Sequence, residues 1–301
     1  MTKTTTNLLG IIITILAGIY FYITCCSECG AAVKEEPAKQ AIVPAEPTAT
    51  SYPFAFSDGD YAFNENDNYN FNASGSEILM PLSTKVEAGI ASLKSFLGEN
   101  TSKVINITGY YKSDESNDSA FPNLGLARAN AVKNHLVANG ISSTQINTFG
   151  SLKDEMVDKD NVYLGPIAYG LDAKSDTADD ELKALYEKIK ANPLVLHFNT
   201  AQASINLNAE QRQKVADISR YLDKVAGATA NIVGHTDNTG NRNTNIGLGQ
   251  ERADFGKAYL IRNGISGDKI NTSSKGPDSP VATNATEEGR AENRRTVITL
   301  N

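Results

Sequence analysis

One stretch of this chain occurs twice, and that repeat limits the folds it can adopt more than any other feature. Residues 128–148 read RANAVKNHLVANGISSTQINT, and residues 252–272 read RADFGKAYLIRNGISGDKINT. Upstream of these stretches, Gly109 pairs with Gly234 at nearly the same spacing. Such self-similarity indicates that one structural unit is present in two copies. We therefore expect two domains of ordinary size rather than one large domain.

The repeats leave a distinct N-terminal region. Residues 8–26 read LLGIIITILAGIYFYITCC, without a charged side chain, and residues 27–51 are rich in Ala, Pro, Glu and Thr. The first segment is long enough to cross a bilayer as a helix, and the second has the composition of a linker. We therefore predict a transmembrane anchor over residues 1–26, a linker over 27–51, a first unit over 52–174 and a second unit over 175–301.

The anchor prediction has two alternatives. A cleaved signal peptide usually has an apolar stretch of only about 7–15 residues, whereas the run here covers residues 8–26 and lacks an A-x-A site. Acylation of Cys25 would instead give an outer-membrane lipoprotein, although the preceding Tyr22-Ile23-Thr24 is a poor cleavage sequence for one. The charges on either side of the run favour an inner-membrane anchor, with the bulk of the chain in the periplasm.

The second unit shows a clear order of elements. Strand-like runs occur at residues 194–198, 230–233, 269–273 and 295–300, and helical spacing of apolar residues occurs at 208–225 and 245–262. Asn245 is predicted to cap the second helix and Gly264 to end it. Helices packed on one side of a small mixed sheet give a two-layer domain. The predicted fold class is therefore α+β, with two tandem domains after one N-terminal helix.

Composition argues against several classes of function. The formal net charge is −7 and no basic cluster occurs, which argues against nucleic acid as a partner. The three cysteines, Cys25, Cys26 and Cys29, are too few for a tetrahedral zinc site, so no metal or cofactor is predicted. No HExxH, GxSxG or GxxxxGKS signature is present, and we expect no enzyme activity.

The most specific motifs lie in the second unit. Gly234-His235-Thr236-Asp237 follows a predicted strand, Arg252-Ala253 lies in a predicted helix, and residues 284–295 read NATEEGRAENRR. In this order and spacing the motifs resemble the OmpA-like peptidoglycan-binding domain, over essentially all of the second unit. The resemblance implies tandem OmpA-like two-layer sandwiches and non-covalent binding of peptidoglycan through the diaminopimelate of its stem peptide.

The motif residues have the charges that such a ligand requires. Diaminopimelate ends in an ammonium and a carboxylate on one carbon; the resemblance implies that Asp237 takes the ammonium and Arg252 both carboxylate oxygens. Thr236 and Asn245 match the family's pattern and would add hydrogen bonds, and Arg294 is a further candidate contact. Structural roles are the alternative, because Asp237 lies in a turn sequence and a helical arginine is most often solvated.

The first unit lacks this set of charges. When the repeats are aligned, Lys112 stands at the position of Asp237, while Arg128 matches Arg252. A lysine there would repel an ammonium group, and no NRR motif closes this unit. We therefore expect a degenerate copy over residues 52–174 that keeps the fold without the site, and that serves as a spacer or contacts another envelope protein.

Together these features predict a cell-envelope protein that tethers a membrane to the cell wall. Lipid would be contacted by residues 8–26 and peptidoglycan by the second unit. The alternative is a scaffold subunit of an envelope complex, such as a motor stator or a secretion anchor, with the first unit as the contact surface. A stator subunit needs a carboxylate within the membrane to carry protons, and residues 8–26 contain none, which disfavours that role.

Overall fold

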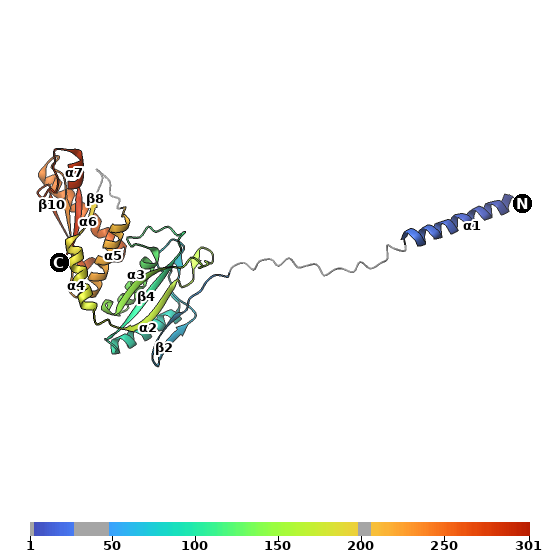
Figure 1. Cartoon of the computed structure of the whole chain (residues 1–301), viewed down its shortest axis with the longest axis horizontal. Helices are drawn as coiled ribbons and strands as arrows, with labels where there is room; N and C mark the ends of the chain where they lie inside the picture. Colours follow the sequence, from blue (N-terminus) through green and yellow to red (C-terminus); the bar gives the residue numbers. More distant parts are fainter. Residues whose placement is uncertain (1–2, 27–47, 198–205) are drawn as a thin grey trace. The chain divides into compact units, whose positions relative to one another are not determined.

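A computed structural model describes residues 3–26, 48–197 and 206–301 (Figure 1). The chain divides into two compact units, Met1–Glu46 and Pro47–Asn301. Most of the predicted linker over residues 27–51 lies outside the described residues. Both sequence repeats fall in the second compact unit, and the division between them at residues 174 and 175 stays a prediction.

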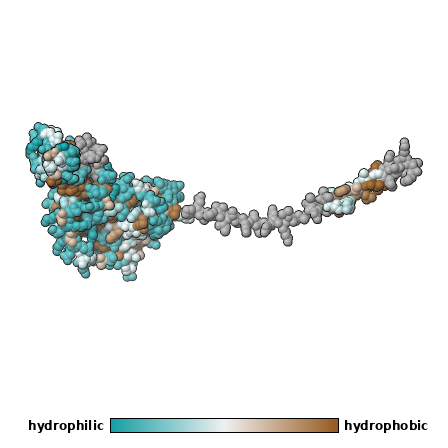
Figure 2. All heavy atoms as spheres, turned by 45° about the horizontal axis from the view of Figure 1, so that its top comes forward, coloured by the Kyte–Doolittle hydropathy of each residue, from teal (hydrophilic) through white to brown (hydrophobic). Residues whose placement is uncertain are grey.

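The N-terminal unit contains one helix. This helix, α1 (Lys3–Phe21), continues as a π-helical turn over Tyr22–Cys26. The helical segment therefore begins before the predicted span of residues 8–26 and ends at the same residue. Its described apolar side chains are exposed, as the brown spheres of Figure 2 show. Among the described residues, no helix combines the length and the apolar character needed to cross a membrane. The predicted transmembrane anchor is therefore not confirmed.

The second repeat is a mixed four-stranded sheet with helices on one face. Its strands, in the order β10-β9-β11-β8, are β8 (Leu194–His197), β9 (Ala230–His235), β10 (Ile270–Gly276) and β11 (Arg295–Leu300). Its helices are α4 (Ala178–Ala191), α5 (Ala209–Lys224), α6 (Arg242–Arg262) and α7 (Glu287–Asn293), with a 3-10 turn over Gly267–Lys269. β9 and β10 are parallel, whereas β11 runs antiparallel to β9 and β8.

The first repeat has the same central topology. Its sheet has the order β5-β4-β7, built from β4 (Lys103–Tyr111), β5 (Ile146–Leu152) and β7 (Ile167–Ala173). The remaining elements are β1 (Phe54–Asp58), β2 (Tyr61–Glu65), β3 (Phe71–Asn72), β6 (Val162–Tyr163), α2 (Thr84–Glu99), α3 (Leu124–Ala138) and a 3-10 turn over Ser143–Gln145. β4 is parallel to β5 and antiparallel to β7, as β9 is to β10 and β11.

The two repeats share the register of their strands as well as their topology. Gly109 of β4 lies opposite Ile167 of β7, and its counterpart Gly234 of β9 lies opposite Thr296 of β11. The sequence repeat is therefore a repeat of three-dimensional structure, which allows positions in one unit to be compared with positions in the other.

Each repeat has its own apolar core between its sheet and its helices. In the second repeat, α5 supplies Val215 and Ile218, which pack with Leu260 of α6 and with Ile232 and Ile298 of the sheet. In the first repeat, residues of α2, α3 and β4 form an equivalent cluster that includes Val86, Ile90, Leu93, Ile105, Ile107, Val132 and Leu136. These apolar residues recur with helical or strand spacing, and burying them gives the two-layer α+β arrangement predicted from the sequence.

Helix α6 begins earlier than the sequence suggests. The prediction placed its cap at Asn245, but the helix starts at Arg242 and Asn241 is the cap. The side-chain oxygen of Asn241 accepts hydrogen bonds from the backbone N–H groups of Asn243 and Thr244, at 2.8 and 3.3 Å. Asn245 therefore lies within the helix, where its side chain is available for another role.

Candidate functional site

The candidate site forms where α6 crosses the end of β9. Gly234 and Gly249 lie so close together that a Cβ atom added to Gly234 would come within 1.8 Å of the Gly249 carbonyl oxygen. A larger residue would push α6 away from the sheet. The two glycines thereby bring the loop after β9 next to the turn of α6 that carries Arg252.

Asp237 is the acidic residue of this loop, and it is 9% exposed. Its Oδ1 accepts a hydrogen bond from the backbone N–H of Thr239 at 2.9 Å, and its Oδ2 accepts one from Nη1 of Arg294 at 2.9 Å. Burial alone would raise the pKa of Asp237, but these hydrogen bonds and the charge of Arg294 outweigh it and lower the pKa. Asp237 is therefore an anion at neutral pH.

Arg252 reaches the same region from α6 and is 8% exposed. Its Nη1 donates to the backbone carbonyl of His235 at 3.1 Å, two residues before Asp237. Burial lowers the pKa of Arg252, and the neighbouring charge of Asp237 partly offsets that effect. The structure thus brings together the two residues that the sequence analysis selected as an anion and a cation.

Thr236 and Asn245 are both buried and both hold the backbone of this loop. The Thr236 hydroxyl donates to the carbonyl oxygen of Asp237 at 2.9 Å. The Asn245 amide donates to the carbonyl oxygens of Asp237 and Thr239 at 3.3 and 3.0 Å. These contacts fix the position of the Asp237 backbone relative to α6.

Arg294 lies immediately before β11 and connects two acidic residues. One end of its guanidinium bonds to Asp237, and Nη2 donates to Oε1 of Glu287 at 2.8 Å. Hydrogen bonds from Arg294 and Arg290 lower the pKa of Glu287. The contact between Arg294 and Glu287 was not predicted; Glu287 directly precedes the E-G-R-A-x-N-R motif, in which Arg294 is the last residue.

Asn293 organises the loop that precedes α7 and was also missed. It is fully buried, and its Oδ1 accepts from the backbone N–H groups of Val281 and Ala282 at 2.8 and 3.1 Å. Its amide donates to Oδ1 of Asn284 at 3.0 Å. Asn293 is the asparagine of the N-R-R motif, so its position in that motif could have indicated a structural role.

His235 lies between the strand and the loop, and it is 5% exposed. Burial, followed by the charges of Arg295 and Lys275, lowers the pKa of His235 to about 4. Its imidazole is therefore neutral at pH 7. The site's charge near this strand end comes from Asp237 and the arginines rather than from histidine.

This geometry suits recognition of a small group with two opposite charges. A carboxylate has about four lone-pair positions, and Asp237 uses one on each oxygen for the hydrogen bonds given above. A guanidinium binds carboxylates through paired N–H donors. Within residues 3–26, 48–197 and 206–301, no group of three or more His, Cys, Asp or Glu side chains is arranged to hold a metal ion.

The first repeat differs at the corresponding positions. Lys112 lies at the position of Asp237, and its Nζ pairs with Oδ2 of Asp114 at 3.5 Å. By strand register, Gly165 stands at the position of Arg294. Of Asp237, Arg252 and Arg294, only Arg252 has a counterpart of the same charge in the first repeat, which is Arg128.

Two α+β repeats, each with an arginine on the helix that crosses a glycine at a strand end, define a protein of the OmpA-like class. The OmpA family model matches residues 70–162 and 199–294, which is more than half of the chain. The chain belongs to the OmpA family, and both repeats are matched.

Curated relatives resemble parts of the chain. The probable lipoprotein YiaD of Escherichia coli K12 is 36% identical over 98 residues, which are 33% of this chain and 45% of YiaD. Peptidoglycan-binding protein ArfA of Mycobacterium tuberculosis is 36% identical over 121 residues, 40% of this chain and 36% of ArfA. The peptidoglycan-associated lipoprotein of Buchnera aphidicola is 34% identical over 122 residues, 40% of this chain and 68% of that protein. The chain therefore spans less than half the length of YiaD and ArfA.

Proposed function

We propose that the second repeat binds peptidoglycan non-covalently, through the diaminopimelate head group of the stem peptide. The observation that carries the proposal is the buried carboxylate of Asp237 beside the guanidinium of Arg252. Membership in the OmpA family supports it, as do two relatives named as peptidoglycan-binding and peptidoglycan-associated proteins. The protein then acts by binding and not by catalysis.

In this proposal the ammonium group of diaminopimelate hydrogen-bonds to Asp237, and its carboxylate bonds to Arg252. Each charge-assisted hydrogen bond contributes about 1.5–3 kcal/mol, so the pair supports a modest affinity. Arg294 keeps Asp237 ionised and in position, and it lies close enough to Asp237 to contact the same head group. Thr236 and Asn245 support the loop and are further candidate ligand contacts.

Sedimentation with insoluble diaminopimelate-type peptidoglycan tests the proposal. The full chain should sediment, whereas Asp237→Asn and Arg252→Lys should remain mostly in the supernatant. Arg252→Lys keeps the charge and loses the paired donors. Arg262→Lys and Asp254→Asn make the same chemical changes at exposed positions of α6, and both controls should sediment like the unaltered chain. Equal sedimentation of all five proteins would refute the assignment of the site.

The function proposed for the N-terminal region is attachment to a membrane in the cell envelope. The described apolar side chains of α1, among them Ile12, Leu16 and Ile19, are exposed and have the chemistry of a lipid-contacting surface. An inner-membrane anchor and an outer-membrane lipoprotein acylated at Cys25 predict different fractions and different masses. Separation of inner and outer membranes, with mass measurement of the mature N-terminus, distinguishes them. Recovery in neither membrane would refute membrane attachment.

The scaffold function remains the second candidate. It predicts that residues 52–174 contact another envelope protein. Substitutions of exposed residues in this region should then disrupt an envelope complex while leaving peptidoglycan sedimentation unchanged.

A further inference from the structure

Arg128 of the first repeat is fully buried and pairs with an acid from its own repeat. Its Nη2 lies 2.5 Å from Oε1 of Glu115, and its Nη1 lies 3.1 Å from Oε2. The side chain of Glu115 is only 3% exposed. The guanidinium therefore grips both oxygens of a carboxylate that is removed from water.

The rest of this carboxylate is satisfied by the backbone. Oε2 of Glu115 accepts from the N–H of Lys112 at 2.8 Å, and Oε1 accepts from the N–H of Ser74 at 2.9 Å. Each oxygen thus accepts one bond from the guanidinium and one from a backbone N–H. Four convergent donors fill the lone-pair positions of a carboxylate.

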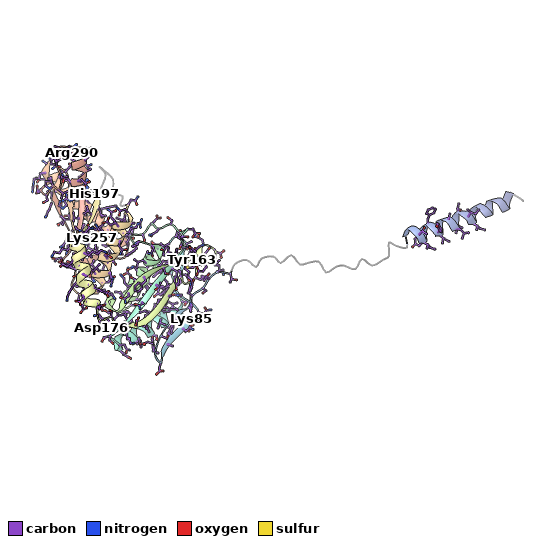
Figure 3. The ribbon with its side chains drawn as sticks, in the orientation of Figure 1. Lys85, Tyr163, Asp176, His197, Lys257 and Arg290 are labelled. Carbon is purple, nitrogen blue, oxygen red and sulfur yellow. The ribbon has the colours of Figure 1, made fainter. Side chains whose placement is uncertain are left out.

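Arg128 is also held by groups that do not involve Glu115. Its Nε donates to the carbonyl oxygen of Gly75 at 2.9 Å. Its guanidinium carbon lies 5.7 Å from the ring centre of Phe71 and 5.3 Å from that of Tyr163, which is labelled in Figure 3. The receptor for the carboxylate is therefore built by the fold around Arg128, and Glu115 is the group that occupies it.

The comparison of the repeats shows that Arg128 and Arg252 are structural counterparts. Nη1 of Arg128 donates to the carbonyl of Tyr110 at 2.8 Å, as Nη1 of Arg252 donates to the carbonyl of His235. The glycine contact repeats too, because a Cβ added to Gly109 would come within 2.0 Å of the Gly125 carbonyl oxygen. The residues of the second repeat that align with Asp114 and Glu115 are Thr239 and Gly240, and neither is acidic.

We propose that the first repeat contains a carboxylate-binding site whose ligand is part of the chain. Glu115 occupies the site, and small monocarboxylates such as acetate bind there once the Glu115 side chain is removed. This inference goes beyond the proposed function, and it does not require peptidoglycan to be the ligand of the second repeat. A consequence is that the first repeat takes no ligand from solution while Glu115 is in place.

Replacing Glu115 with Ala in the full chain tests the proposal. The variant has a buried guanidinium without its carboxylate, which is strongly destabilising. Acetate should restore the missing charge and raise the thermal midpoint by about 2–4 °C above that in chloride at equal ionic strength. Glu115→Gln is the matched control, because its amide fills the same space and should leave no room for acetate.

Two further proteins, the unaltered chain and a variant that also carries Arg252→Lys, separate acetate binding at the first repeat from acetate binding at the second. Acetate bound at Arg252 would raise the thermal midpoint of the unaltered chain as well. Introducing Arg252→Lys would remove this contribution to the rise. A Glu115→Ala protein that folds only when acetate is present supports the proposal equally. The proposal is overturned if Glu115→Ala gains no more from acetate than Glu115→Gln does, or if it fails to fold in acetate and chloride alike.

Discussion

The guanidinium of Arg294 donates to the carboxylate of Asp237 across 2.9 Å, and both side chains are only 12% exposed. This contact joins the segment before β11 to the loop after β9, so two motifs far apart in the sequence meet at one ion pair. Because the pair lowers the pKa of Asp237, it maintains the negative charge on which the proposed ligand contact depends.

Replacing Arg294 with Gln should therefore destabilise the second repeat by about 1–3 kcal/mol, because a mostly buried carboxylate loses a charge-assisted hydrogen bond. Urea unfolding measures the loss. Arg220→Gln is the matched control; Arg220 pairs with Glu181 at the surface and should matter little. In a double-mutant cycle, strict additivity of Arg294→Gln and Asp237→Asn would contradict a direct interaction.

The close approach of Gly234 and Gly249 predicts a strong effect of one methyl group. Gly234→Ala should lower the free energy of unfolding by about 3 kcal/mol or more, since α6 must move away from β9. Gly247→Ala adds the same methyl group on an exposed turn of α6, where a Cβ meets nothing within 4 Å. It should stabilise the helix by about 0.5–1 kcal/mol. Thermal or urea unfolding checks both, and a neutral Gly234→Ala would argue against this packing.

The stability of the second repeat should decrease in mild acid because of His235. Burial lowers the pKa of His235 from 6.5 to about 4. Between those values the unfolded chain binds a proton that the folded chain does not, so the free energy of unfolding falls as the pH is lowered. This group accounts for at most about 3 kcal/mol.

His235→Gln removes the titrating group and provides the comparison. Its free energy of unfolding should fall less than that of the unaltered chain between pH 7 and pH 4, measured by urea unfolding at several pH values. Parallel curves for the two proteins would show that His235 is protonated in the folded state as readily as in the unfolded one.

Asn293 should be one of the most sensitive polar positions, since its side chain satisfies several backbone groups in the interior. Asn293→Ala should cost about 2–4 kcal/mol, because the N–H groups of Val281 and Ala282 lose their acceptor. Asn231→Ala is the control; its amide group contacts Asn271 at the surface. Similar thermal midpoints for the two variants would contradict the structural role of Asn293.

Elements of the second repeat were predictable because their apolar residues recur at regular spacing. The strand at residues 295–300 and the glycine after α6 are where the pattern places them, and Gly264 has the positive φ of 87° that favours glycine at a helix end. The cap of α6 was not predictable. Asn241 and Asn245 are equally good capping residues, and only the tertiary contact of Asn245 with the Asp237 loop distinguishes them.

The candidate site was predictable in its charges but not in its internal contacts. Asp237 and Arg252 follow from the resemblance of their motifs to the OmpA-like domain, whereas the Arg294–Asp237 pair depends on how β11 aligns with β9. In the first repeat, two acidic residues, Asp114 and Glu115, follow Lys112 closely in the sequence. Loop geometry leaves Asp114 exposed and turns its neighbour Glu115 inward onto Arg128, which residue spacing alone does not reveal.

The occupation of Arg128 by Glu115 has a consequence for how the protein behaves on a polymer. With one repeat closed by its own side chain, each molecule is monovalent under the proposed function, and avidity between the two repeats does not arise. Residence on the wall then equals the lifetime of a single contact. A monovalent chain can dissociate from one stem peptide and bind the next, so the attachment adjusts as the wall is remodelled. The total strength of attachment then scales with the number of chains.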